Sequence, residues 1–304
     1  MTNPNTMWFK NLRIYRFTKR PSISSESLAE QLEQHPFRPC SSVDFSRSGW
    51  VSPLGNLSDQ LVHSVGQYHL FCARRQEKIM PAAAVNELVE EKVQAFEAQQ
   101  ARKIYRKEKL RLKDDVLHSL LPQALTRSAY TFAYIDNSNK YLVIDTTSAA
   151  RADDFMDALR ASMGELAVVP LACHGDAAQV MTRWIKSRTP TGFELDDECE
   201  LTNEREKRNT VKCKNQDLGG DEIRTHLNAG KRVTQLALAW RNAIRFILTD
   251  DFTLRRVKFE DSISEDAGDD AAAQFDQDFA VMTIQVTQLL QELLEEFGGV
   301  AKAR

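Results

Sequence analysis

An apolar stripe that ends in the middle of a helix-forming stretch constrains this chain most strongly. Apolar residues recur at three- and four-residue intervals after Pro81, at Val85, Leu88, Val89, Val93 and Phe96. The stripe then stops, because the next positions in register hold Gln99, Gln100, Lys103 and Lys107. A segment that still favours helix but has little to bury predicts a helical projection that leaves its domain at about Gln99. A second helix is expected to start at Asp114 or Asp115 and to run to Pro122.

The rest of the chain mixes short helices with alternating runs typical of antiparallel strands. Strands are predicted at Phe9–Phe17, Val43–Val51, Tyr68–Ala73, Tyr130–Ile135, Tyr141–Asp145, Leu166–Leu171, Val211–Lys214, Lys231–Trp240, Ala243–Thr249 and Leu254–Glu260. Helices are predicted at Ser25–Gln34, from Ser148 to Gly164, at Gln179–Ser187 and at Asp221–Asn228. Glu194–Asn209 and Asp261–Asp270 have the composition of loops. Without regular strand–helix alternation, the pattern predicts an α+β fold with antiparallel sheets and packed helices.

A long amphipathic helix is predicted near the C-terminus, over Gln274–Phe297. Its apolar residues are spaced by four, three, four, three and four positions: Phe275, Phe279, Met282, Val286, Leu289 and Leu293. Such a face either covers the protein's own sheet or pairs with a second copy of the helix. Both interpretations stay open, and the wide apolar face would allow both.

Charge is strongly segregated along the 304 residues, although the net charge is only -3. The Ala101–Lys113 segment carries seven basic residues against one acid, Glu108: Arg102, Lys103, Arg106, Lys107, Lys109, Arg111 and Lys113. The Glu260–Phe279 segment carries eight acids and no base. This segregation favours an anionic ligand on one surface and repels it from another.

The basic run is therefore the first candidate for a DNA contact. In a continuous helix Arg102, Arg106, Lys109 and Lys113 would lie close to one line, and such a row can neutralise several phosphates. Lys212, Lys214 and Gln216 form a second candidate, and the exposed sides of the last three strands a third. The alternative for each is an ordinary solvated surface. No zinc finger or helix-turn-helix pattern is present, so sequence-specific base recognition is not expected.

Motifs for catalysis, metals and membranes are not found in the sequence. It contains no phosphate-binding glycine loop, no paired Cys/His spacing and no nucleophile elbow. We therefore predict no cofactor, no metal and no catalytic residue. The five cysteines form no C-x-x-C pair, which favours reduced thiols in the cytoplasm, and neither a signal peptide nor a membrane span is expected.

Two other function classes remain as alternatives. The acidic groups Asp196–Glu198 and Asp250–Asp251 would suit a metal-dependent DNA-processing enzyme if they gathered around a metal ion. A protein-interaction scaffold would use the basic helix to bind an acidic partner.

Ordered strings along the chain resemble the recombination-associated protein RdgC family. The strings are Trp8–Leu12, Phe71–Arg74, Glu77–Pro81, Glu97–Lys103, Val116–Pro122, Gln216–Leu218, His226–Leu227, Ala229–Lys231, Thr234–Trp240, Asp250–Asp251, Leu254–Phe259 and Phe275–Phe279. Each is weak alone, but their order is specific and covers the chain from about Met7 onward.

The resemblance implies a ring-shaped homodimer around a positively lined hole that admits double-stranded DNA, and possibly also single-stranded DNA. It implies sequence-independent binding on the bacterial nucleoid, with a role in recombination and replication-fork repair that restrains the RecA recombinase. One dimer contact would involve Leu120, Leu121 and Leu125, and the other the C-terminal helix at Phe279, Met282, Val286, Leu289 and Leu293. A finger-like loop beside the hole would correspond to Lys212–Gln216.

Three structural parts are expected from these patterns. A central α+β domain would comprise residues 1–80 and 126–170. Residues 81–125 would form the helical projection, and residues 171–304 would form a second α+β domain at the base.

Overall fold

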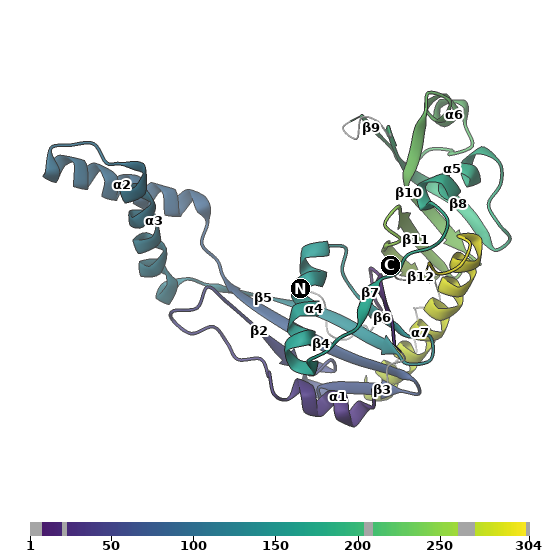
Figure 1. Ribbon diagram of the computed structural model, residues 1–304, viewed down its shortest axis with the longest axis horizontal. Coiled ribbons are helices and arrows are strands. Elements are labelled where there is room, and N and C mark those ends of the chain that lie inside the picture. Colours follow the sequence, from purple (N-terminus) through teal and green to yellow (C-terminus); the bar gives the residue numbers. More distant parts are fainter. Residues whose placement is uncertain (1–7, 20–22, 204–208, 261–270, 302–304) are drawn as a thin grey trace.

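The computed structural model describes residues 8–19, 23–203, 209–260 and 271–301. These residues form an open crescent, with two antiparallel sheets on one side and a long arm on the other (Figure 1). The predicted loop Asp261–Asp270 lies outside the described residues. The α+β class with antiparallel sheets and packed helices is confirmed.

The first sheet contains seven strands in the order β2-β4-β5-β6-β1-β7, with β3 paired to β4 beside β2. Its strands are β1 (Arg13–Phe17), β2 (Ser46–Val51), β3 (Val62–Val65), β4 (Tyr68–Lys78), β5 (Thr126–Asp136), β6 (Tyr141–Ile144) and β7 (Val168–Pro170). The predicted hairpin between β5 and β6 is confirmed, and the Asp136 carboxylate accepts hydrogen bonds from the backbone N–H groups of Ser138 and Asn139 in its turn.

The second sheet contains five strands in the order β12-β11-β10-β8-β9. Its strands are β8 (Phe193–Asn203), β9 (Thr210–Cys213), β10 (Lys231–Trp240), β11 (Ile244–Thr249) and β12 (Leu254–Phe259). The prediction that Glu194–Asn209 is a loop was wrong, since most of this segment is β8, which pairs with both β9 and β10. The predicted meander of the last three strands is confirmed.

Helices complete both layers. They are α1 (Ser25–Leu32), α2 (Ala82–Gln100), α3 (Arg106–Leu120), α4 (Ala149–Met163), α5 (Ala177–Lys186), α6 (Asp221–Asn228) and α7 (Ala271–Glu296), with short 3-10 turns at Gly55–Leu57 and Leu121–Gln123. The hydroxyls of Ser24 and Ser148 cap α1 and α4 by accepting backbone hydrogen bonds. Both helices cover one face of the first sheet, where Leu28, Leu32 and Phe155 are buried.

Helix α7 packs one face against both sheets. Its apolar face joins residues of both sheets in one core, and at one end His63 of β3 contacts Phe275 edge-on. The predicted dimer contacts Phe279, Met282, Val286, Leu289 and Leu293 are each 0% exposed. Within the single chain these side chains are covered by the protein's own sheets, and the interface at this helix stays a prediction. The alternative, a helix that covers the protein's own sheet, is what the structure shows.

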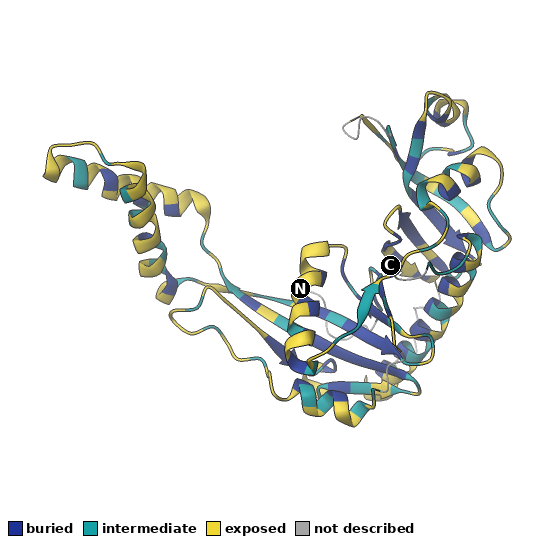
Figure 2. Ribbon diagram, in the orientation of Figure 1, coloured by how far each residue is buried: buried dark blue, intermediate teal, exposed yellow. Residues whose placement is uncertain are grey.

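The arm is built from a ribbon of β4 and β5, which β3 and β2 flank along the β4 edge as far as Glu77, and from a helical hairpin. Strands β4 and β5 pair over their full length, from Tyr68 opposite Asp136 to Lys78 opposite Thr126. Helices α2 and α3 continue from the far end of this ribbon and pack on each other (Figure 1). A small core of Val85, Val89, Val93 and Val116 holds them together, while most of their surface is exposed (Figure 2).

The predicted course of this projection needs two corrections. The first helix ends at Gln100, where Ala101 adopts a left-handed conformation with φ of 50°. The second helix begins at Arg106 rather than at Asp114 or Asp115. Arg102 and Lys103 therefore lie in the connection between helices, and the predicted straight row of Arg102, Arg106, Lys109 and Lys113 does not form.

Candidate nucleic-acid interface

All seven basic residues of the predicted helix are exposed at the outer part of the arm. Two of them are paired within the arm. The Arg102 guanidinium donates two hydrogen bonds to the Glu108 carboxylate, at 2.9 and 2.7 Å. Lys109 forms an ion pair with Glu90 of α2. Among the described residues, no ion-pair partner is found for the other five, Lys103, Arg106, Lys107, Arg111 and Lys113. These five cations are thus available to an external anion.

The connection between α2 and α3 is held by two carboxylates. Glu97 accepts a hydrogen bond of 2.9 Å from the backbone N–H of Ile104, and Glu108 accepts one of 2.9 Å from that of Tyr105. Hydrogen bonds from Arg102 and from the Tyr105 backbone lower the pKa of Glu108 to about 2. We call the contacts of Glu108 with Arg102 and the Tyr105 backbone the clamp. Its carboxylate stays ionised at neutral pH, so the clamp continues to hold the connection.

The ribbon of the arm carries further cations that sequence reasoning did not select. Arg74 of β4 lies with its guanidinium 4.3 Å from the centre of the Phe37 ring and donates hydrogen bonds to Ser128. Arg75 pairs with Asp154, and Arg127 of β5 pairs with Glu77. Strand β4 continues five residues beyond the predicted strand, and this extension carries the charged residues. Their position directly after the predicted strand was the sequence signal that could have identified these cations.

The second predicted site lies on the second sheet, at its edge strand β9. Lys212 and Lys214 are exposed, and they reach across to acids of β8. Lys212 lies 3.0 Å from Glu200, and Lys214 lies 3.7 Å from Glu198. The side-chain amide of Gln216 is bound by Glu222. Their positive charge is thus offset locally, in contrast to the five unpaired cations on the arm.

The acidic residues Asp196, Asp197 and Glu198 lie at an irregularity of β8. Cys199 pairs with Leu236 and Leu195 with Leu238, so β8 contains two more residues than β10 over this interval. The bulge directs Glu198 to Arg256, at 2.6 Å, and Asp196 to Arg245, at 3.4 Å. Burial would raise the pKa of Glu198, but hydrogen bonds and charge from Arg256 and Lys214 outweigh it and lower that pKa. Asp196 and Glu198 are thus ion-pair partners of the sheet's own cations.

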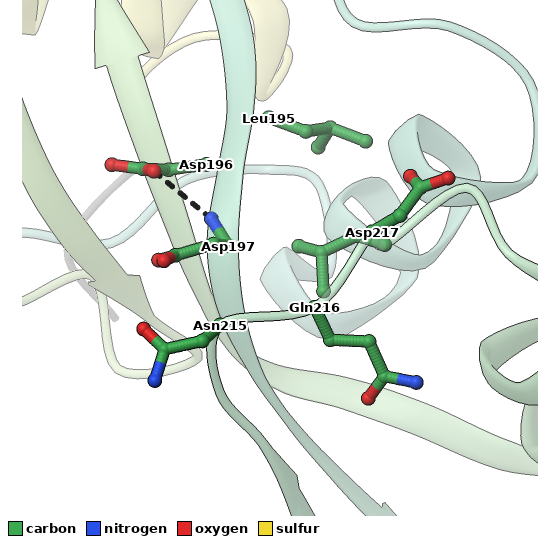
Figure 3. A pocket seen from close by; sticks show the side chains of 7 residues that line it. Leu195, Asp196, Asp197, Asn215, Gln216 and Asp217 are labelled. Atoms are coloured by element: carbon green, nitrogen blue, oxygen red, sulfur yellow. Dashed lines mark hydrogen bonds between the residues drawn. The ribbon is translucent and has the colours of Figure 1, made fainter.

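Asp196 and Asp197 also line a shallow pocket with Asn215, Gln216 and Asp217 (Figure 3). Leu195 and Leu218 complete its lining, and Asp196 accepts a hydrogen bond from the backbone N–H of Asp197. Among the residues that the structure describes, no group of three or more His, Cys, Asp or Glu side chains is arranged to hold a metal ion. The predicted alternative of carboxylates gathered around a metal at Asp196–Glu198 finds no support in this geometry.

The predicted dimer contact near the root of the arm divides into buried and exposed residues. Leu121 is 1% exposed, so in the single chain it is covered by neighbouring residues, and its role as a dimer contact stays a prediction. Leu120 is half-buried against α2 and α3. Leu125 is 77% exposed, and its carbonyl accepts a hydrogen bond from the backbone N–H of Ile79, another exposed apolar residue. Phe45, also exposed, lies beside this strand end.

A single chain does not bring the two cationic regions together. The helical hairpin lies at one end of the crescent, and β9 lies at the other end, as the edge strand of the second sheet (Figure 1). Within the described part of the chain, no helix is long and apolar enough to cross a membrane.

These features define a class: an elongated α+β protein with two sheets joined by one helix, a helical arm, and exposed cations at both ends. Residues 7–300 match the family described as "Putative exonuclease, RdgC". Proteins named "Recombination-associated protein RdgC" from Yersinia pestis (strain Pestoides F) and Yersinia enterocolitica are each 42% identical to this chain over 301 residues. The alignments cover 97% of this chain and 99% of each relative. The chain belongs to the RdgC family.

Proposed function

We propose that this chain is a non-catalytic, sequence-independent binder of double-stranded DNA that acts in recombination. The observation that carries this proposal is the set of exposed, unpaired cations on the arm: Lys103, Arg106, Lys107, Arg111 and Lys113. Cations on α3 and in the connection before it can contact successive phosphates and release counterions without reading any base. The names of the relatives support the link to recombination.

The proposed assembly is a homodimer in which two crescents enclose the DNA. One chain places its cationic regions at opposite ends of an open shape, so a second copy would complete a continuous positive lining (Figure 1). The exposed apolar residues Leu125, Ile79 and Phe45 at the root of the arm support a contact between copies there. Helix α7 would support this dimer indirectly, because its buried apolar face holds the two sheets of each chain together.

The proposed biological action is to limit access of the RecA recombinase to DNA on the nucleoid, in the cytoplasm. A protein that occupies phosphates along any duplex competes with every other protein that needs the same backbone. Occupancy alone then restrains strand exchange and protects replication forks during repair, and no base recognition is required.

The decisive test compares duplex affinity across a range of salt concentrations. Replacing Arg106, Lys107 and Arg111 by alanine removes three unpaired cations, so the slope of log affinity against log salt should fall by roughly two to three. The matched control is the triple alanine variant of Lys186, Arg188 and Arg224, which removes the same charge from the base domain. Equal slopes for the arm variant and the unaltered protein would contradict the proposal.

The competing proposal of a nuclease needs its own experiment. Incubating supercoiled plasmid with excess protein and magnesium or manganese measures cleavage directly. We expect no nicks, because Asp196 and Glu198 are engaged by arginines rather than directed at a common point. Metal-dependent nicking that is lost in Asp197→Asn would overturn the non-catalytic assignment.

A further inference from the structure

Tyr105 is a large apolar side chain exposed at the outer end of the arm. Its side chain belongs to the connection between α2 and α3 and is 71% exposed, more than any other described tyrosine. A ring of this size normally buries most of its surface. Tyr105 immediately precedes α3, in a part of the arm where most residues are exposed.

The backbone that carries the ring is anchored, and one side of the ring has a neighbour. Its backbone N–H is bound by Glu108, and the same carboxylate binds Arg102 through two hydrogen bonds. The Arg102 guanidinium lies 5.1 Å from the centre of the Phe96 ring and 5.5 Å from the centre of the Tyr105 ring, which is cation–π range. Arg102 thus supports one side of Tyr105, and the exposed surface is the rest of the ring.

The surroundings of the exposed ring are strongly cationic. Lys103 precedes it, and Arg106 and Lys107 follow it in the first turn of α3, all exposed and without an ion-pair partner among the described residues. Of the two carboxylates that hold the connection, Glu108 is paired with Arg102, and Glu97 accepts a hydrogen bond from the backbone N–H of Ile104. An aromatic surface flanked by cations suits a ligand that offers both a flat ring and negative charge.

We propose that Tyr105 stacks on an unpaired nucleobase while Lys103, Arg106 and Lys107 contact the adjoining phosphates. The proposal rests on the proposed DNA-binding function and adds a second kind of contact to it. Bases inside a continuous duplex already have both faces stacked, so the ring can reach only bases in single strands, at ends, in gaps or at junctions. The tip of the arm therefore distinguishes DNA with unpaired bases from continuous duplex.

A comparison of two strands that differ only in their bases tests this contact. The full chain is titrated with a strand of about 12 deoxyadenosines and with an abasic strand of the same length, and binding is followed by fluorescence anisotropy. Tyr105→Ala should weaken binding to the deoxyadenosine strand by about tenfold and leave binding to the abasic strand within about twofold of the unaltered protein. Tyr105→Phe, which keeps the ring, should restore binding.

Tyr130→Ala is the matched control, because Tyr130 is also exposed and also has an arginine guanidinium 5.5 Å from its ring centre. It lies in the ribbon rather than at the tip, and its replacement should leave both affinities unchanged. Equal losses on the two strands in Tyr105→Ala would overturn stacking, as would no loss on either strand or a Phe variant that behaves like Ala. Failure of the unaltered protein to bind continuous duplex would instead overturn the proposed function itself.

Discussion

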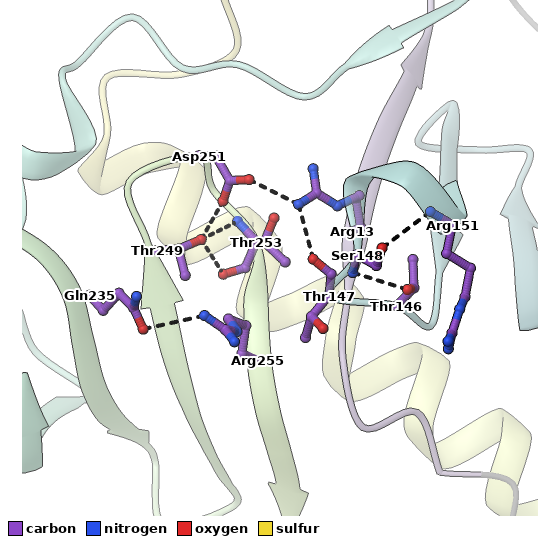
Figure 4. A network of polar contacts seen from close by, with 10 residues as sticks. All are labelled: Arg13, Thr146, Thr147, Ser148, Arg151, Gln235, Thr249, Asp251, Thr253 and Arg255. Carbon is purple, nitrogen blue, oxygen red and sulfur yellow. Dashed lines mark hydrogen bonds and ion pairs between the residues drawn. The ribbon is translucent and has the colours of Figure 1, made fainter. Parts of the chain in front are cut away.

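Arg13 and Asp251 form an ion pair of 3.0 Å that joins the two sheets. Arg13 lies in β1 of the first sheet, and Asp251 lies in the turn between β11 and β12 of the second (Figure 4). Arg13 also donates a hydrogen bond to the carbonyl of Thr147, beside the capped start of α4. The pair thus adds to the backbone hydrogen bonds between Leu12 and Leu254, which also join the two sheets.

Two neighbouring carboxylates at this junction have opposite pKa shifts. Burial by itself would raise the pKa of Asp251, but hydrogen bonds from Thr249 and Thr253 and the charge of Arg13 outweigh it, so this pKa is lowered. Burial and the charge of Asp251 raise the pKa of Asp250. Protonation of the two residues on acidification should therefore affect stability in opposite directions.

We predict that Asp251→Asn lowers the free energy of unfolding at pH 7 by roughly 0.5 kcal/mol, a small value because the carboxylate is half exposed. The contribution of Asp251 is present above its unfolded pKa of about 3.9 and is lost as pH falls through the lower folded pKa. The difference from the unaltered protein should then vanish in acid. Denaturant unfolding at several pH values measures it.

Asp250→Asn is the control for this prediction. A raised folded pKa means that ionised Asp250 costs stability at neutral pH, so its removal should leave the protein equally stable or slightly more stable. Equal destabilisation by both variants at pH 7 would contradict the role of the Arg13 pair.

The burial of α7 predicts a large cost for truncating its core face. Phe279→Ala should lower the free energy of unfolding by about 3–5 kcal/mol, because it removes a fully buried ring between the sheets. Ile284→Ala, on the same helix but half exposed, should cost less than about 1 kcal/mol. Chemical denaturation compares the two variants, and similar costs would show that this face of α7 is not in the core.

Removing a carboxylate from the bulge of β8 should strengthen DNA binding, if the proposed function holds. Glu198 pairs with both Lys214 and Arg256, so Glu198→Gln releases two cations toward phosphate. We expect affinity for duplex to rise about twofold to fivefold at low salt, with a steeper salt dependence. Asp197→Asn changes the same charge in the same bulge without releasing an ion-paired cation, and it should have the smaller effect. Equal gains in affinity for the two variants would mean that the change in net charge strengthens binding, rather than the release of Lys214 and Arg256.

The clamp at the arm tip predicts a local effect of Glu108. Glu108→Gln weakens the bidentate contact with Arg102 and the bond to the Tyr105 backbone, so the backbone amide of Tyr105 should exchange with solvent severalfold faster. The folded pKa of about 2 lies below the unfolded value, so the stabilising contribution is present above about pH 4.3 and is lost only toward pH 2. Hydrogen exchange between pH 5 and 8 should therefore show no pH-dependent loss of the clamp beyond intrinsic exchange.

Much of the fold could be predicted where local signals agree. Ser148 and Gly164 mark the two ends of α4, and the turn residues after Asp136 mark a hairpin. The apolar spacing along α7 identified its buried face, although not what covers it. A stripe on a helix has the same form whether its partner is the protein's own sheet or a second subunit.

The failures have equally local causes. In β8 the alternation of Phe193, Leu195, Cys199 and Leu201 is interrupted by Asp197 at the bulge, and acids fill the other face, so the segment resembled a loop. The turn at Ala101 adopts positive φ without the glycine that usually marks it. It depends on the contact of Arg102 with Glu108, six residues apart, which no helix or turn periodicity reveals.

The continuous pairing of β4 and β5 has a mechanical consequence. Because β2 also pairs with β4 as far as Glu77, the first sheet supports this pair of strands almost to the root of the helices. Beyond it, the 19 residues of α2 at about 1.5 Å each make a lever of about 28 Å. A rotation of about 5° where the helices join the strands, within the ordinary twist variation of strands, moves the far end of α2 by about 2 Å, so a small change at the root alters the width of the mouth of the crescent.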